Sequence, residues 1–225
     1  MTKGLFVTGT DTGVGKTRVA VALVQALAGA GVRAIGMKPV AAGFEPGRAV
    51  NGDVAALAAA DGLDVPLRDR NTYAFETAVA PHLAAEAAGI AIELASIEAA
   101  ARRLQARARV LIVEGAGGPL VPLDAKNDML DVAVRLDLPV LLVVGMRLGC
   151  LNHALAAALA IRRRGLVLRG YVVNVLPPPM MLLDRNVATL ADRLGMPPVA
   201  VAGAFEWPRF DDQALTALGL VSEPC

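Results

Sequence analysis

Short apolar runs recur along the chain, and segments with helical periodicity separate them. The runs are Leu5–Val7, Ala34–Met37, Val110–Val113, Val140–Val144, Gly170–Val175 and Val199–Ala202. Strands that alternate with helices form a parallel sheet covered by helices. The pattern therefore predicts a single-domain α/β fold over residues 1–225, with three layers: a mostly parallel central sheet and helices on both of its faces.

The connection between the second and third runs is longer than a simple crossover needs. It extends from Gly43 to about Arg109 and has helical patterns near Val54–Ala60, Pro81–Ala88 and Ser96–Ala106. A chain of 225 residues suffices for one sizeable α/β domain and does not require a second. We therefore interpret this segment as an elaboration of the same domain.

Composition and charge narrow the kinds of partner that the protein would bind. Apolar residues make up 55% of the chain and aromatic residues only 4%, so the core must consist mainly of Ala, Val and Leu, which suits buried parallel strands. Lys and Arg number 22 against 21 for Asp and Glu, which gives no electrostatic argument for binding nucleic acid or an acidic membrane surface. Any anion site must therefore be local.

The cysteines and the amino terminus indicate a reducing environment. Cys150 and Cys225 are too few for a disulfide framework and are not in a metal-ligand spacing. The amino terminus lacks the apolar region and cleavage site of a signal peptide, and no apolar run approaches the roughly 20 residues that span a bilayer. We expect a soluble cytoplasmic protein without a membrane partner.

Polar and glycine residues follow the apolar runs, where the carboxyl ends of the predicted strands lie. They are Thr8 with the glycine-rich segment after it, Lys38, Glu114, Gly145 and Asn174. Ligands of open parallel sheets bind at this edge. We therefore expect the chemistry of the protein to take place there.

The most specific motif is the segment Gly9–Thr17, between the first predicted strand and a helix indicated by the apolar periodicity of residues 20–27. A glycine-rich turn here aims backbone N–H groups and a helix N-terminus at one point, which favours a phosphate. Lys16, expected in an exposed loop, would reach the outer phosphates of a nucleotide, and the Thr17 hydroxyl would ligate magnesium. The loop is one residue longer than usual, because Thr10 stands where the first glycine is normally found. The motif predicts a P-loop NTPase-like fold.

Three further side chains at this edge have both a functional and a purely structural interpretation. Lys38 would stabilise a transferring phosphoryl group or bind an anionic substrate group, although it could be a structural lysine. Glu114 precedes four small residues and resembles the carboxylate that orders magnesium in phosphate-loop NTPases, although strands often end in a glutamate. For Asp53, capping of a helix over Val54–Ala60 is a complete explanation without metal.

Five segments together resemble the dethiobiotin synthetase family, the ATP-dependent enzymes that close the ureido ring in biotin synthesis. They are Val7–Thr12 with Val14–Thr17, Lys38–Val40, Val113–Gly118, Val143–Gly145 and Leu148–Ala154, and they follow one another in the order of the family. The resemblance implies conversion of diaminopelargonate (7,8-diaminononanoate), CO2 and MgATP into dethiobiotin, ADP and phosphate. A carbamate of the substrate would accept the γ-phosphoryl group, and the second amine would displace phosphate.

The resemblance also implies roles for the residues at matching positions. Lys16, Lys38 and Thr12 would serve catalysis, and Thr17, Asp53 and Glu114 would hold Mg2+. The nucleotide would contact Gly13, Val14, Gly15, Lys16, Thr17, Arg18, Asp53, Glu114, Gly115, Ala116, Gly117, Asn174, Glu206 and Trp207. The substrate would contact Thr12, Lys38, Ala42, Gly149, Cys150, Leu151 and Asn152, with the helix start at 149–152 acting across the interface of a homodimer.

Three positions depart from the pattern of the family. Ala42 stands where a serine often contacts the substrate, so the hydroxyl is missing. The segment Ala204–Trp207 replaces a common Glu-Ile-Pro sequence near the base, which leaves the base contacts and the preference for ATP open. Gly13 stands where some relatives have a larger acidic residue, a change that a glycine-rich loop tolerates.

Two other classes of protein share the predicted fold. A regulatory or partitioning ATPase of the deviant Walker A group would act as a nucleotide-gated switch, but it has a second lysine early in the loop, where this chain has Asp11. An ATP-dependent amidase-type synthetase acting on cobyrinate-like acids is normally joined to a glutaminase domain, for which this chain leaves no room. A purely structural binding module would not explain Lys38 and Glu114 at one edge.

Overall fold

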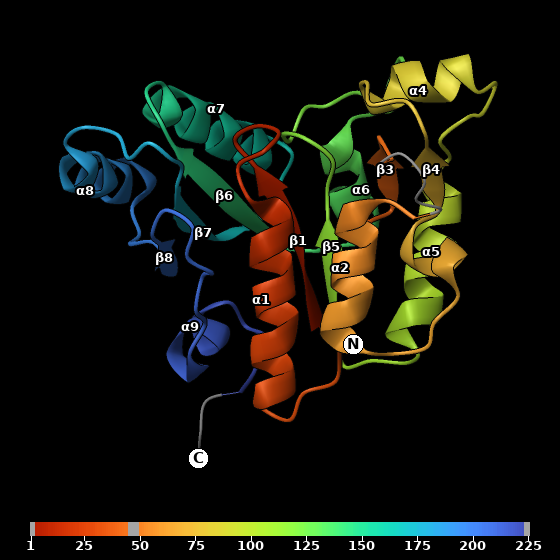
Figure 1. Ribbon diagram of the computed structural model, residues 1–225, viewed down its shortest axis with the longest axis horizontal. Helices are drawn as coiled ribbons and strands as arrows, with labels where there is room; N and C mark the ends of the chain where they lie inside the picture. The colour runs from red at the N-terminus through yellow and green to blue at the C-terminus, as the bar shows by residue number, and fades with distance from the viewer. Residues whose placement is uncertain (1–2, 45–49, 223–225) are drawn as a thin grey trace.

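A sheet of six parallel strands forms the centre of the computed structural model, which describes residues 3–44 and 50–222 (Figure 1). The strands are β1 (Lys3–Gly9), β2 (Ala34–Met37), β5 (Val110–Glu114), β6 (Val140–Met146), β7 (Leu168–Val175) and β8 (Ala200–Ala202), in the spatial order β2-β5-β1-β6-β7-β8. All six predicted runs are confirmed as strands. In the parallel register of β1, Phe6 lies opposite Val113 of β5 and Val140 of β6. The strand order reverses beside β1, which is where parallel sheets bind ligands.

Helices cover both faces of the sheet, as the pattern predicts. They are α1 (Lys16–Gly29), α2 (Gly52–Asp61), α3 (Leu67–Arg70), α4 (Pro81–Ala87), α5 (Leu94–Gln105), α6 (Met129–Arg135), α7 (Cys150–Arg163), α8 (Leu183–Leu194) and α9 (Asp212–Ala217). Because successive side chains of a strand point to opposite faces, Leu5 and Val7 pack with α1, α2 and α9, whereas Phe6 packs with α5, α6 and α7. Figure 1 shows α1 and α2 side by side in front of the sheet. No helix in residues 3–44 and 50–222 is both long enough and apolar enough to cross a membrane.

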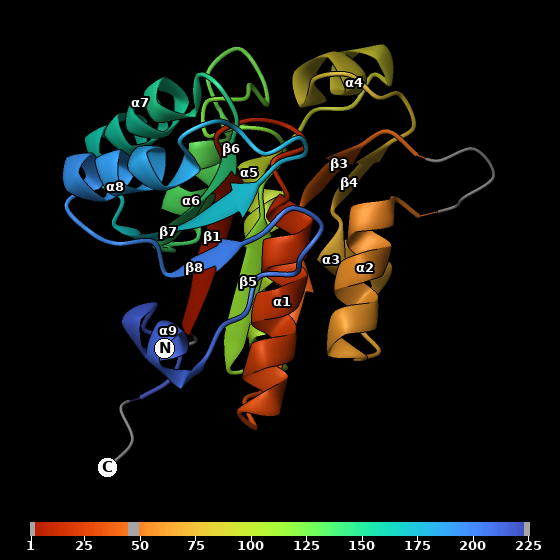
Figure 2. The same cartoon turned by 60° about the vertical axis from the view of Figure 1, so that its left-hand side comes forward.

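The long connection after β2 contains the expected helices and a small second sheet. Helices α2, α4 and α5 match the predicted patterns, while α3 and the parallel strands β3 (Val40–Ala42) and β4 (Tyr73–Phe75) were not predicted. Elements of three or four residues are too short to show a period. Figure 2 shows α4 beyond β3 and β4, at the end of the molecule where the carboxyl ends of the central strands lie.

A buried ion pair fixes the end of β2. The Arg70 guanidinium donates to Asp61 Oδ2 at 2.5 Å and to the Gly36 carbonyl at 2.7 Å, and both charged side chains are almost fully buried. The Arg70 carbonyl accepts a hydrogen bond from the backbone N–H of Lys38 at 2.9 Å. Arg70 therefore connects the end of α2 with the backbone that places Lys38, a link that no sequence pattern indicated.

Candidate active site

The glycine-rich loop lies between β1 and α1, at the carboxyl edge of the sheet. A hollow of about 760 Å³ opens beside it. The predicted residues that line this hollow are Thr12, Gly13, Gly15, Lys16, Thr17, Arg18, Lys38, Ala42, Asp53, Glu114, Ala116 and Gly117. The structure therefore brings the phosphate loop together with residues that follow β2 and β5.

Lys16 is not exposed, contrary to the sequence-based expectation. It is 6% exposed, and its ammonium donates to the Asp11 carbonyl at 2.9 Å, so its side chain folds back over the loop. Burial, with a smaller contribution from the charge of Lys38, lowers the pKa of Lys16 to about 8. The loop thus holds a cation in a poorly hydrated position, where its attraction for an anion is strong.

Lys38 binds two carboxylates at once. Its Nζ lies 2.6 Å from Glu114 Oε1 and 2.9 Å from Asp53 Oδ2, and it also donates to the Gly115 carbonyl at 3.3 Å. Burial alone would lower the pKa of Lys38, but the two carboxylates outweigh burial and raise it. The same contact outweighs the effect of burial on Asp53 and lowers the pKa of that carboxyl. Lys38 therefore lies buried between two carboxylates beside the hollow, and not out on a helix face, where a structural lysine is more often found.

Asp53 does not cap α2. The cap is Asn51, whose side-chain oxygen accepts from the backbone N–H of Asp53 at 3.0 Å and whose amide donates to the Gly43 carbonyl at 2.6 Å. The carboxylate of Asp53 is thereby free to face Lys38. Asn51 was the missed residue, although an Asx side chain two positions before Asp53 is itself a capping signal.

The donor set around Glu114 fits a hard divalent cation. Glu114 is fully buried; its Oε1 accepts from the Thr17 hydroxyl at 2.8 Å, and its Oε2 has no hydrogen-bond partner among the described residues. A buried carboxylate oxygen without a partner is costly unless a cation or water completes it. No group of three or more His, Cys, Asp or Glu side chains suited to a metal occurs in residues 3–44 and 50–222. Mg2+ needs no such group, because phosphates and water supply most of its ligands.

Five predicted nucleotide contacts do not line the hollow: Val14 and Gly115, and three residues from the other side of the loop, Asn174, Glu206 and Trp207. The Asn174 amide, at the end of β7, donates to the Val14 carbonyl inside the loop at 2.8 Å. Trp207 packs against Arg18 of α1, and the Arg18 guanidinium donates to the carbonyl of Glu206. These three residues belong to the side of the loop that faces β7 and β8, opposite the side of Lys38 and Glu114.

The segment Gly149–Asn152 begins α7 and lies outside the hollow of its own chain. Gly149 has a φ of +96°, no side chain caps the helix start, and the backbone N–H of Cys150 donates to the Arg147 carbonyl at 2.9 Å. The residue before this segment, Leu148, is 95% exposed. Arg147 forms an ion pair with Asp11, which connects the start of α7 with the phosphate loop.

Some lining residues were not predicted. They are Ala41, Asn51, Ala78, Val79, Ala80, Pro81 and Val121. Most of them are small or apolar and carry no chemical signal in the sequence. A further missed residue is Asn71, whose amide donates to the Lys38 carbonyl at 2.8 Å and so stabilises the backbone at that lysine.

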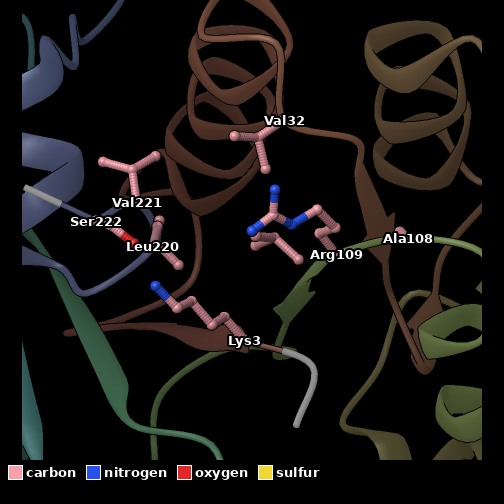
Figure 3. Close-up of a pocket in the computed structure, with 8 residues that line it drawn as sticks. Lys3, Val32, Ala108, Arg109, Leu220, Val221 and Ser222 are labelled. Carbon is pink, nitrogen blue, oxygen red and sulfur yellow. The ribbon is translucent and has the colours of Figure 1, made fainter. Parts of the chain in front are cut away.

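A second hollow, of about 610 Å³, lies at the opposite end of the sheet (Figure 3). Lys3 and Arg109, from the starts of the two neighbouring strands β1 and β5, point into it beside Leu220 and Val221. No predicted site residue lies there. The chemistry that the sequence predicts is thus confined to the carboxyl edge.

The backbone conformation of the phosphate loop depends on two glycines with positive φ, Gly13 and Gly15. A Cβ on Gly15, at φ +92°, would lie 2.4 Å from Asn174 Nδ2, whereas a Cβ on Gly13, at φ +74°, would meet nothing within 4 Å. Both alanine variants carry backbone strain, but only Gly15→Ala adds a clash. We expect Gly15→Ala to lower the free energy of unfolding by about 2 kcal/mol more than Gly13→Ala. Urea unfolding of both variants measures this, and equal losses would contradict the packing described.

At the carboxyl edge of the parallel sheet, a strand leads into a glycine-rich loop and then into a helix that begins with Lys16-Thr17. This arrangement defines a P-loop nucleoside triphosphatase. The chain matches the model of a family described as AAA domain over residues 3–209. Solved structures agree on the fold: MinD from Pyrococcus horikoshii, complexed with Mg-ADP, has a TM-score of 0.56 at 16% identity, with 98% of this chain and 86% of that chain covered. A ParA family ATPase from Chlorobium tepidum has a TM-score of 0.55 at 14% identity, covering 97% and 89%.

Similarity in sequence is much higher to one group of enzymes. The ATP-dependent dethiobiotin synthetase BioD of Nitrosospira multiformis is 51% identical over 197 residues, which are 88% of this chain and 86% of that protein. The protein of the same name from Aromatoleum aromaticum is 48% identical over 87% of this chain and 88% of its own length. The chain belongs to the ATP-dependent dethiobiotin synthetase family.

Proposed function

We propose that this enzyme carboxylates diaminopelargonate with CO2 and closes the ureido ring of dethiobiotin at the expense of ATP. It is a ligase of biotin synthesis. The observation that carries the proposal is the convergence of Lys38, Asp53, Glu114 and Thr17 beside the phosphate loop, at distances of 2.6 to 2.9 Å. A nucleotide-binding site alone does not need the second lysine.

The chemistry needs stabilised negative charge at two stages. A substrate amine adds to CO2 to give a carbamate, and a carbamate oxygen then attacks the γ-phosphorus of ATP, with ADP leaving. The second amine attacks the carbonyl carbon, the bond from carbon to the bridging oxygen breaks, and phosphate leaves with that oxygen. Lys16 would stabilise the transferring phosphoryl group and Lys38 the carbamate, with Thr12 beside the substrate.

Mg2+ would be held by Thr17, Asp53 and Glu114, whose donor atoms fit it as described above. When bound, the metal would neutralise the negative charge that develops on the phosphates during transfer. Lys38 already places one positive charge between Asp53 and Glu114, so these two carboxylates retain a net negative charge that a divalent cation complements.

The remaining nucleotide contacts divide between the two sides of the loop. Backbone groups from Gly13 to Thr17 would cradle the phosphates, and Gly115–Gly117 would let the ligand approach closely because their side chains are small. Arg18, Asn174, Glu206 and Trp207 would face the base end. The base preference itself is part of the proposal.

A homodimer would complete the substrate site. Leu148 is 95% exposed, and a hollow of about 410 Å³ on α7 is lined by Leu120, Leu159 and the stems of Arg163 and Arg164, an apolar surface that suits a second copy. The N–H groups at Gly149–Asn152 would then bind the substrate carboxylate from the partner subunit.

Ala42 provides no hydroxyl for the substrate. The enzyme would work in the cytoplasm, where ATP and the substrate are available.

The switch-type ATPases are not favoured as an alternative. MinD and ParA share the fold at 16% and 14% identity, whereas the synthetases are 48% and 51% identical to this chain. The direct test is incorporation of labelled bicarbonate into an acid-stable product. Label should appear only when MgATP and diaminopelargonate are supplied together. Nucleotide binding without labelled dethiobiotin would refute the proposal and favour a switch.

A further inference from the structure

Arg18 makes two contacts with a segment that is remote in sequence. Its guanidinium carbon lies 5.3 Å from the centre of the Trp207 ring, and it donates to the Glu206 carbonyl. A planar guanidinium can stack on an aromatic face and still donate in its own plane, which a lysine ammonium cannot do. The first turn of α1 is thus tied to the chain that follows β8.

The segment 203–207 depends on these contacts with Arg18 because its own backbone is irregular. It leaves β8 in a turn closed by the Glu206 N–H on the Gly203 carbonyl at 3.0 Å, and Phe205 adopts a φ of +69°. Phe205 is 80% exposed and Trp207 53% exposed, so the core does not hold these side chains in place. Arg18 belongs instead to a helix whose next residues, Val19 and Ala20, are buried.

The strand order decides which part of a nucleotide lies near this contact. β2 and β5, which bring Lys38 and Glu114, are on one side of β1, while β7 and β8 are on the other. With the outer phosphates bound where Lys16, Lys38 and Glu114 converge, as proposed above, the base would extend toward β7 and β8. Arg18 lines the hollow immediately after Thr17 and stands between these two ends.

We propose that Arg18 is a positioning residue that holds Glu206 and Trp207 against α1 as a wall for the base of a nucleoside triphosphate. The proposal rests on the proposed function for the identity of the nucleotide. The wall sets the affinity for ATP and its preference over CTP, whose smaller base fills less of the space. Arg18 takes no part in bond breaking.

Trp207 is the single tryptophan of the chain, so its fluorescence reports on this contact directly. We expect Arg18→Met, which keeps the length and removes the charge, to shift the emission of Trp207 and to weaken its response to added ATP. KM for ATP should rise about 10-fold, clearly more than kcat falls, and the preference for ATP over CTP should shrink. Arg18→Lys should restore little of this effect, because it cannot stack and donate together. Arg107→Met, on an exposed turn after α5, is the matched control and should resemble the wild type.

Trp207 supplies the reciprocal variants. Trp207→Phe should keep an ATP affinity near that of the wild type, whereas Trp207→Leu should lose about as much as Arg18→Met. The double variant Arg18→Met/Trp207→Leu should lose little more than either single one, because both remove the same contact. Additive losses, or an Arg18→Met protein with unchanged KM and base preference, would overturn the proposal. A fall in kcat with KM unchanged would overturn it too.

Calorimetric titration with ATP separates this proposal from the function itself. It measures binding whether or not product forms, and thermal unfolding of each variant shows that the fold is retained. If the wild type makes no dethiobiotin but Arg18→Met still weakens ATP binding, the proposed function fails and the wall stands. If dethiobiotin forms and Arg18→Met binds ATP like the wild type, the wall fails and the function stands.

Discussion

Lys38→Met should lower the rate of dethiobiotin formation by about 100- to 1,000-fold while changing the affinity for ATP far less. Methionine has nearly the length of lysine and no charge, so the variant removes the ammonium that lies 2.6 Å from Glu114 and 2.9 Å from Asp53. That ammonium is on the side of the hollow away from β7 and β8, where the base would lie. We therefore expect its charge to serve the carbamate and the transferring phosphoryl group more than the binding of the nucleotide.

The comparison with Lys16 makes this prediction specific. Lys16 belongs to the phosphate loop, and Lys16→Ala should abolish phosphoryl transfer and also weaken ATP binding. Steady-state rates and calorimetric titrations with a non-hydrolysable ATP analogue measure the two effects separately. Lys38→Arg keeps the charge and should be less impaired than Lys38→Met. Equal losses of turnover and ATP affinity in Lys38→Met would make this residue a nucleotide clamp and contradict its assigned role.

Arg70→Met should lower the free energy of unfolding by about 3–5 kcal/mol, because it leaves the buried carboxylate of Asp61 without its partner. The Arg70 and Asp61 side chains are 2% and 0% exposed, so water cannot replace the lost contact. Urea unfolding followed by circular dichroism gives the value. The variant should also lose turnover, since the Arg70 carbonyl accepts from the N–H of Lys38 at 2.9 Å.

An ion pair with one exposed member serves as the control. Arg103 pairs with Asp69 at 2.8 Å; the Asp69 side chain is 5% exposed, but that of Arg103 is 54% exposed, so water can reach the contact and Arg103→Met should cost clearly less than Arg70→Met. The double variant Arg70→Met/Asp61→Leu should recover much of the stability lost in Arg70→Met, because no charge is then left buried. A loss in Arg70→Met as small as that in Arg103→Met would show that the buried pair does not hold this region.

The sequence predicted the framework well because its signals are local. Each central strand is a continuous apolar run, and α1 shows its buried face in the spacing of residues 20–27. The polar residues after β1, β2 and β5 meet because parallel strands end at the same edge. That rule alone placed Lys16, Lys38 and Glu114 around one hollow.

The features that the sequence did not predict depend on tertiary neighbours. Arg70 and Asp61 pair across two elements, and nothing near either residue indicates its partner. Asp53 adjoins a helix start and so resembled a cap, whereas Asn51 performs that role and frees Asp53 for Lys38. Lys16 is buried because it folds back onto Asp11, a conformation that loop composition does not specify.

The central claim is that the phosphoryl group of ATP is transferred to a carbamate and not to water. The most direct measurement supplies freshly dissolved C18O2 with MgATP and diaminopelargonate in unlabelled water, and analyses the released phosphate by mass spectrometry after a short reaction. The account predicts one 18O in phosphate for each dethiobiotin formed, because the bridging oxygen of the carbamate leaves with phosphorus. Phosphate that carries only unlabelled oxygen would contradict it and would identify hydrolysis by water.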